Sequence, residues 1–232
     1  MCWSATADLV AGTGIAAIGV ACVARVRQVR DLPVAALPLL LGAHQIIESV
    51  IWRSGGGTGP ATLAWAVIAL PVLPLWVALG VLCAAPPQAR RRLLVPVAAA
   101  VATAVPLAYS LATRPVTAEI RGHTLGYALD LPRSGLLVTG YLLATVGALL
   151  LSGDPVLRSL GATAAAGAVV CAALWRLEFV STWCAFAAVC SVILLVRTRS
   201  DPAARSAPGP SSGSGRIGHR STRARHGPDE RP

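Results

Sequence analysis

Apolar residues along this chain gather into stretches of helix length, separated by short segments rich in Arg, Gly and Pro. A membrane-crossing helix needs about 20 consecutive, mostly apolar residues. The first five stretches fit this length, and they predict spans at Ala5–Ala24, Pro33–Trp52, Ala61–Ala85, Leu93–Ala112 and Gly135–Ser152. The pattern predicts an all-α polytopic membrane helix bundle.

The last apolar stretch is too long for one crossing. Leu160–Val196 holds 37 residues that are interrupted only by Arg176 and Glu178. At about 1.5 Å per residue, this stretch is roughly twice as long as a bilayer core is thick. We therefore expect it to fold back between Arg176 and Thr182, which brings the count to seven transmembrane helices.

The composition agrees with a membrane protein, because 55% of the 232 residues are hydrophobic and only 13% are charged. A soluble domain would carry about 25% charged residues. From Asp201 onward the chain is rich in Pro, Gly, Ser and Arg and has no apolar period, which is typical of disorder. We expect a transmembrane domain over residues 1–200 and a disordered cytoplasmic tail over residues 201–232.

The net charge of +10 comes entirely from Arg, since the chain has no Lys. These arginines cluster between the spans and in the tail instead of forming one basic face, so no nucleic-acid partner is expected. Cytoplasmic loops carry the excess of Arg. Ten arginines fall on one side of a seven-span topology and five on the other, which predicts a plasma-membrane protein with its N-terminus out and C-terminus in.

The second span carries polar residues where a bilayer offers only hydrocarbon. His44 and Glu48 are four residues apart and share a helix face, and Gln45 lies beside them. Polar and ionisable groups inside a span are costly and usually face a protein interior or a wet cavity. These three residues are the predicted floor of a site.

Other polar side chains are expected at the same outer end of the bundle, where they would complete a ligand-binding pocket. They are His123, Tyr127, Arg176, Glu178 and Trp183. Glu48 has two open interpretations: an ion pair with Arg176 that only joins two helices, or a functional carboxylate. His44 and Glu48 with His123 would also make a ligand set for zinc or iron.

Six cysteines are present and none forms a CxxC pair, so a zinc framework is not expected. Cys2 and Cys184 both fall at the outer surface, where the compartment permits oxidation. A disulfide between them would tie the first span to the last, and two unpaired thiols are the alternative.

Three motifs give a family resemblance: Met1-Cys2-Trp3-Ser4-Ala5 at the start, His44-Gln45-Ile46-Ile47-Glu48 with Trp52, and Ser181-Thr182-Trp183-Cys184. Together they resemble an uncharacterised family of bacterial multi-span membrane proteins, a domain of unknown function, over Met1 to about Arg199. Trp3 stands where that family usually has Phe, and His44 where it usually has Gln. The resemblance implies a membrane protein and carries no activity.

We therefore expect an integral membrane protein that binds or senses a small molecule or lipid in an outward-facing polar pocket. Its partners would be the lipid bilayer and that ligand. A metal-dependent membrane-embedded hydrolase is the first alternative, and seven spans with an outer site are similar in architecture to ceramidase-like hydrolases. An ion-coupled carrier is the second, although the inner halves of the spans are almost entirely Ala, Leu and Val.

Overall fold

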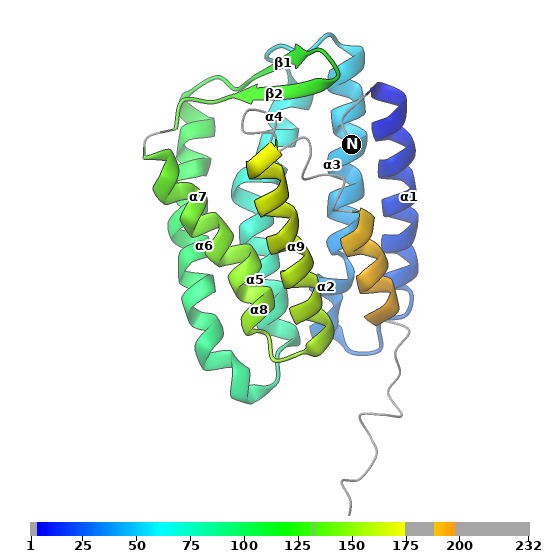
Figure 1. Ribbon diagram of the computed structural model, residues 1–232, viewed down its shortest axis with the longest axis vertical. Helices are drawn as coiled ribbons and strands as arrows, with labels where there is room; N and C mark the ends of the chain where they lie inside the picture. The colour runs from blue at the N-terminus through cyan, green and yellow to red at the C-terminus, as the bar shows by residue number, and fades with distance from the viewer. Residues whose placement is uncertain (1–3, 132, 175–187, 198–232) are drawn as a thin grey trace, which may run out of the picture. The chain divides into compact units, whose positions relative to one another are not determined.

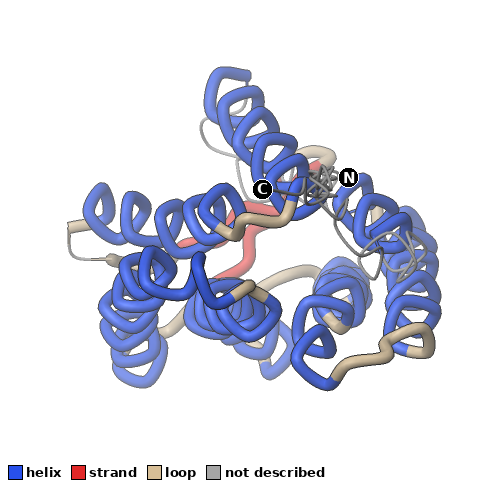
Figure 2. The backbone as a smooth tube through the Cα atoms, turned by 90° about the horizontal axis from the view of Figure 1, so that it is seen from below, coloured by secondary structure: helices blue, strands red, loops and turns tan. Residues whose placement is uncertain are grey.

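The computed structural model describes residues 4–131, 133–174 and 188–197 of the chain, and most of these residues are helical (Figure 1). The helices run side by side, as Figure 2 shows in a view along them. The first helix, α1 (Ala5–Val23), begins at Ser4, whose hydroxyl accepts a hydrogen bond from the N–H of Ala7 at 3.2 Å. A short 3₁₀ turn, η1 (Val29–Asp31), and α2 (Leu32–Ala35) lead into α3 (Leu37–Arg53).

Close packing joins α1 to α3, which run antiparallel. A Cβ added at Gly12 would lie 2.9 Å from the carbonyl oxygen of Gly42. One added at Gly42 would lie 2.7 Å from the backbone nitrogen of Ala16. Small residues let membrane helices approach this closely. The spacing fixes which side chains of α1 reach the polar face of α3.

The remaining helices fall where the sequence predicts spans, with ends shifted by a few residues. The largest shift is at the fourth span, where the helix begins before its three arginines instead of after them. These elements are α4 (Pro60–Val67), η2 (Ile68–Val72), α5 (Leu73–Ala84), α6 (Pro87–Thr113), α7 (Ser134–Leu142), η3 (Leu143–Gly147), α8 (Ala148–Leu151), α9 (Pro155–Leu174) and a last helix, Ala188–Arg197.

A distortion in the third span follows from its prolines. Pro71 has no backbone N–H to give, and the chain widens there into the π turn η2. The N–H of Leu73 donates to the carbonyl of Ile68, five residues back. The carbonyl of Ala69 instead accepts a hydrogen bond from the hydroxyl of Tyr141, at 2.8 Å. A neighbouring helix thus satisfies a backbone group that the π turn leaves out of the regular ladder.

The predicted loop between the fourth and fifth spans contains a β-hairpin, so the all-α prediction is wrong at this place. Strands β1 (Thr117–Arg121) and β2 (Thr124–Ala128) pair antiparallel through a turn in which Gly122 has a φ of +62°. Backbone hydrogen bonds of 2.7 and 3.2 Å between Gly57 and Ala118 tie the hairpin to the α3–α4 loop. The hairpin therefore covers the end of the bundle where α3 ends (Figure 1).

Five helices in the described residues are long and apolar enough to cross a membrane. They span Ala5–Ala24, Val29–Arg53, Pro60–Ala84, Pro87–Thr113 and Ser134–Leu151. Two shorter apolar helices, Pro155–Val170 and Ala188–Arg197, occupy the places of the predicted sixth and seventh spans. The predicted turn between those spans and the predicted tail lie outside the described residues, and seven crossings stay a prediction.

Candidate functional site

Glu48 is completely buried in the middle of the predicted site, and two side chains donate hydrogen bonds to it. The hydroxyl of Tyr127, on β2, donates to Oε1 at 3.1 Å. The amide of Gln45, one helical turn away on α3, donates to Oε2 at 3.4 Å. The hairpin therefore supplies a donor to an acid in the second span, across 79 positions of sequence.

Aromatic rings connect this carboxylate to His44. Trp65 of α4 is 1% exposed, and its ring stacks on Tyr127 with centroids 3.4 Å apart and planes 7° from parallel. Trp65 also contacts the imidazole of His44, with ring centroids 4.8 Å apart and ring planes tilted by 36°. Burying one large ring among these neighbours fixes the orientation of both polar residues.

A second buried acid joins the site from α1. Asp8 is completely buried and belongs to a face formed with Gly12, Ile15, Gly19 and Cys22, which packs against α3. These residues repeat at intervals of four and three, so they lie along one side of the helix. The close approach at Gly12 brings α1 near enough to α3 for Asp8 to reach the polar face.

Asp8 interacts electrostatically with His44 and lies within reach of the Trp52 indole. The indole N–H does not meet hydrogen-bonding geometry, and both oxygens of Asp8 are without a hydrogen-bond partner. We use the name polar cluster for the connected side chains of Asp8, His44, Gln45, Glu48, Trp52, Trp65 and Tyr127.

All the buried side-chain polar atoms that lack a hydrogen-bond partner in the described residues belong to the polar cluster. They are Asp8 Oδ1 and Oδ2, His44 Nε2, Trp52 Nε1 and Trp65 Nε1. Leaving one such atom unsatisfied costs about 1–3 kcal/mol. This concentration in one place therefore marks the cluster as the part of the bundle with unused hydrogen-bonding capacity.

The structure brings four of the predicted site residues together, namely His44, Gln45, Glu48 and Tyr127. It places His123 in the exposed turn of the hairpin. Within the described ranges, no three His, Cys, Asp or Glu side chains are grouped to hold a metal ion. The metal site built on His123 has no support from this arrangement.

The other predicted residues lie outside the described part of the chain. They are Arg176, Glu178, Trp183, Cys2 and Cys184. The ion pair between Glu48 and Arg176 and the disulfide between Cys2 and Cys184 therefore stay predictions. Among the cysteines whose side chains are described, Cys83 and Cys190 carry free thiols.

Three members of the polar cluster were not among the predicted site residues, namely Asp8, Trp52 and Trp65. Asp8 lies near the start of the first span, and its spacing from Gly12 and Gly19 places it on the face of α1 that packs most closely. Trp65 lies five residues into α4 with ordinary apolar neighbours. No sequence signal separates it from a lipid-facing anchor, because its role comes from the hairpin that stacks on it.

A network of charges at the opposite end of the bundle was also not predicted. Arg197 is 6% exposed, and its guanidinium contacts Asp154 Oδ2 at 3.0 Å and Asp31 Oδ1 at 3.3 Å. Asp154 also caps α9 by accepting hydrogen bonds from the N–H groups of Val156 and Leu157. These contacts join the start of α2, the start of α9 and the end of the last helix.

The pKa of Asp154 reflects its burial and its contacts with Arg197 and the start of α9. Burial raises the pKa of the carboxyl, whereas the Arg197 guanidinium and the two backbone N–H groups lower it, and the result lies below the ordinary value of 3.8. The lowering effects therefore outweigh the burial of the group. Asp154 is ionised and paired in the folded protein at neutral pH.

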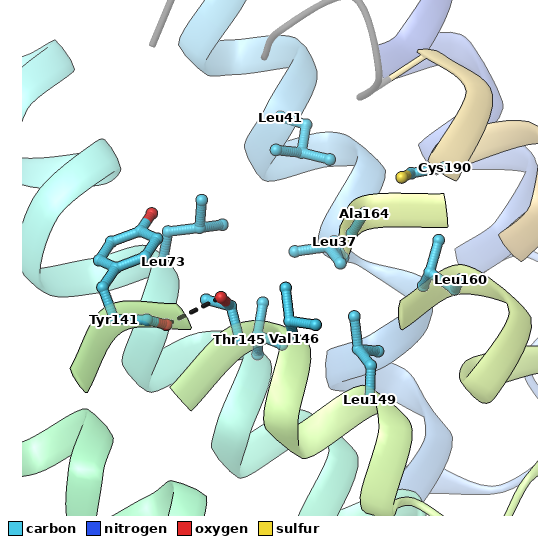
Figure 3. A pocket seen from close by; sticks show the side chains of 11 residues that line it. Leu37, Leu41, Leu73, Tyr141, Thr145, Val146, Leu149, Leu160, Ala164 and Cys190 are labelled. Carbon is cyan, nitrogen blue, oxygen red and sulfur yellow. Dashed lines mark hydrogen bonds between the residues drawn. The ribbon is translucent and has the colours of Figure 1, made fainter. Parts of the chain in front are cut away.

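An apolar cavity of about 80 Å³ lies among α3, α5, the continuous segment α7–η3–α8, α9 and the last helix, and Figure 3 shows its lining side chains. Leucines make up much of its wall, and Thr145 and Tyr141 contribute two hydroxyls. Both hydroxyls are engaged, since Thr145 donates to the Tyr141 carbonyl at 2.8 Å and Tyr141 donates to Ala69. No residue of the polar cluster lines this cavity.

One known protein family matches most of the chain. Residues 1–209 match a family described as Family of unknown function (DUF6629), and the chain belongs to it. No curated protein and no solved structure matches the chain. The expected membership of an uncharacterised family is confirmed, and the site has to be interpreted from its own chemistry.

Proposed function

We propose that this member of a family without an assigned activity is an integral membrane protein that binds a small molecule or a lipid head group at the polar cluster. The observation that carries the proposal is the gathering of unsatisfied buried polar atoms in one place. Two are carboxylate oxygens, which accept, and two are indole N–H groups, which donate. A polar ligand would satisfy them and recover the free energy of burying them.

Two features support a binding role over a purely structural one. Glu48 is held by donors from different elements, Tyr127 of the hairpin and Gln45 of α3, so its position is fixed before any ligand arrives. The hairpin that holds Tyr127 is attached through a loop of three consecutive glycines with positive φ. Glu48 is thus held in place on α3, and the hairpin above it is attached separately. This arrangement suits a site that admits a ligand from one end of the bundle.

The outward orientation of this site is part of the proposal. Arg90, Arg91, Arg92 and Arg158 are exposed, and they lie near the starts of α6 and α9, at the end opposite to the hairpin. Cytoplasmic loops carry the excess of Arg. In a seven-span protein of the plasma membrane, the polar cluster would then open toward the outside.

Equilibrium dialysis tests the binding function directly. The purified protein in lipid nanodiscs is dialysed against the small-molecule fraction of an extract of the cells that produce it, and retained compounds are identified by mass spectrometry. We expect wild type to retain a compound that Glu48→Gln does not. The matched control is Glu119→Gln, because Glu119 is an exposed carboxylate of the same hairpin that pairs with Arg121.

Retention by Glu48→Gln equal to that of wild type would contradict the proposal, as would a wild type that retains nothing beyond empty nanodiscs. Tyr127→Phe provides a second variant in case Glu48→Gln does not fold. It removes one donor to the carboxylate and leaves the charge in place, and we expect it to weaken retention.

A further inference from the structure

Asp8 gives the polar cluster a specific chemistry. Its carboxylate is fully buried, and within the described part of the chain neither oxygen has a hydrogen-bond partner. None of the arginines in the described ranges pairs with it. A buried carboxylate without hydrogen-bond partners is costly, and the cost falls when a cation or a strong donor meets it.

A third unpartnered atom lies near this carboxylate. His44 is 7% exposed, interacts electrostatically with Asp8 and has no partner at Nε2. In the tautomer protonated at Nδ1, Nε2 is an acceptor. Asp8 and His44 then present three acceptor atoms, which equals the number of N–H donors on a primary ammonium group.

The rest of the cluster also favours a cation. The indole of Trp52 lies beside Asp8, and the faces of aromatic rings attract cations. Glu48 adds a second buried carboxylate. We propose that the polar cluster recognises a primary ammonium group, held between the Asp8 carboxylate and His44 Nε2. This inference rests on the proposed binding function and adds the chemical class of its ligand.

A primary ammonium group has two sources at a membrane, a soluble amine and the head group of phosphatidylethanolamine. Both present the same N–H donors, so the structure assigns the group and experiment assigns the source. Phosphatidylcholine provides the comparison, because its quaternary ammonium carries no N–H.

Calorimetric titration of the full-length protein in phosphatidylcholine nanodiscs tests the inference, with ethylammonium chloride as the probe. We expect saturable binding that is at least about tenfold weaker in Asp8→Asn, which is the loss expected for one hydrogen bond to a charged group. Asp130→Asn is the matched control, because the side chain of Asp130 is 91% exposed and pairs with Arg114. Tetramethylammonium should also bind at least about tenfold more weakly than ethylammonium.

The source follows from repeating the titration in phosphatidylethanolamine nanodiscs. Loss of ethylammonium binding there identifies the lipid head group as the ligand, and unchanged binding identifies a soluble amine. Either result supports recognition of a primary ammonium. If Asp8→Asn does not fold, the comparison of ethylammonium with tetramethylammonium on wild type decides.

Three results would overturn the inference. The first is equal binding of ethylammonium by wild type and Asp8→Asn. The second is competition for the site by sodium chloride that is as strong as that by ethylammonium. The third is ethylammonium binding that appears only after residues 1–3 are deleted. The last result would mean that the chain's own α-amino group is the ammonium at Asp8. A neutral or anionic compound retained in the dialysis experiment would also refute the ammonium while leaving the binding function intact.

Discussion

Replacing Arg197 with Met tests how the bundle holds its last helix. Arg197 is 6% exposed, and the side chains of its partners Asp31 and Asp154 are 20% and 22% exposed. Breaking a buried ion pair by removing one partner costs about 3–5 kcal/mol. The two carboxylates keep some access to water, which reduces this cost, so we expect Arg197→Met to lower the free energy of unfolding by about 2–4 kcal/mol.

A double-mutant cycle separates the ion pair from the packing of the arginine stem. Asp154→Asn removes the charge but keeps a side-chain oxygen that can cap α9. Because Arg197 and Asp154 are in direct contact, we expect a coupling of about 1–3 kcal/mol between the two substitutions. The assay is reversible unfolding in mixed detergent micelles, followed by circular dichroism.

The same cycle has a pH dependence with a defined sign. The pKa of Asp154 is lower in the folded protein than its ordinary value of 3.8. The pairing therefore contributes its full stability above that value, and the contribution is lost as the pH falls through the lower folded pKa. Asp154→Asn should remove this part of the acid sensitivity.

Arg158→Met is the control for the cycle, because Arg158 is exposed and forms no ion pair within the described ranges. Its effect should stay within about 0.5 kcal/mol. A change this small in Arg197→Met would refute the reasoning, since it would mean that the network contributes nothing to the stability of the fold.

Three further substitutions test the site and its supports. Tyr127→Phe removes a donor to the buried glutamate and should cost about 1–3 kcal/mol in unfolding free energy, whereas Tyr109→Phe, at a residue that is 71% exposed, should cost nothing measurable. Gly42→Leu should force α1 from α3 and abolish monodisperse protein in size-exclusion chromatography, while Gly14→Ala, where a Cβ meets nothing within 4 Å, should be neutral or stabilising. Tyr141→Phe takes the donor from the carbonyl freed by the π turn, and thermal unfolding should show a loss of about 1–3 kcal/mol; an unchanged transition would mean that the carbonyl finds another partner.

Hydropathy was sufficient to place the helices but not the hairpin. The first predicted span and α1 begin at the same residue, because a long apolar run has one low-energy state in a bilayer. The segment Thr113–Ser134 has no such run, and its two strands are only five residues each. They are stabilised by pairing with each other and by the bridge from Gly57 to Ala118, and the second of these contacts is not local in the sequence.

The candidate site could be predicted only from the side of α3. His44, Gln45 and Glu48 stand out because they interrupt an apolar span, and each is buried as expected. Asp8 also interrupts a span, but its position near the end of the helix allows an ordinary interfacial role. Its complete burial and the close packing at Gly12 show that it is turned inward.

The two ends of the bundle handle buried charge differently, and this contrast is the strongest argument that the polar cluster is more than a helix staple. At the arginine-rich end, Arg197 is met by two carboxylates, and Asp154 also receives two backbone N–H groups. The chain therefore contains the residues needed to neutralise a buried charge. At the hairpin end, Asp8 is buried as deeply and has no hydrogen-bond partner among the residues that the structure describes. A structural acid there would be expected to carry hydrogen-bond partners like those of Asp154, so the free accepting capacity of Asp8 suits the ammonium ligand proposed above.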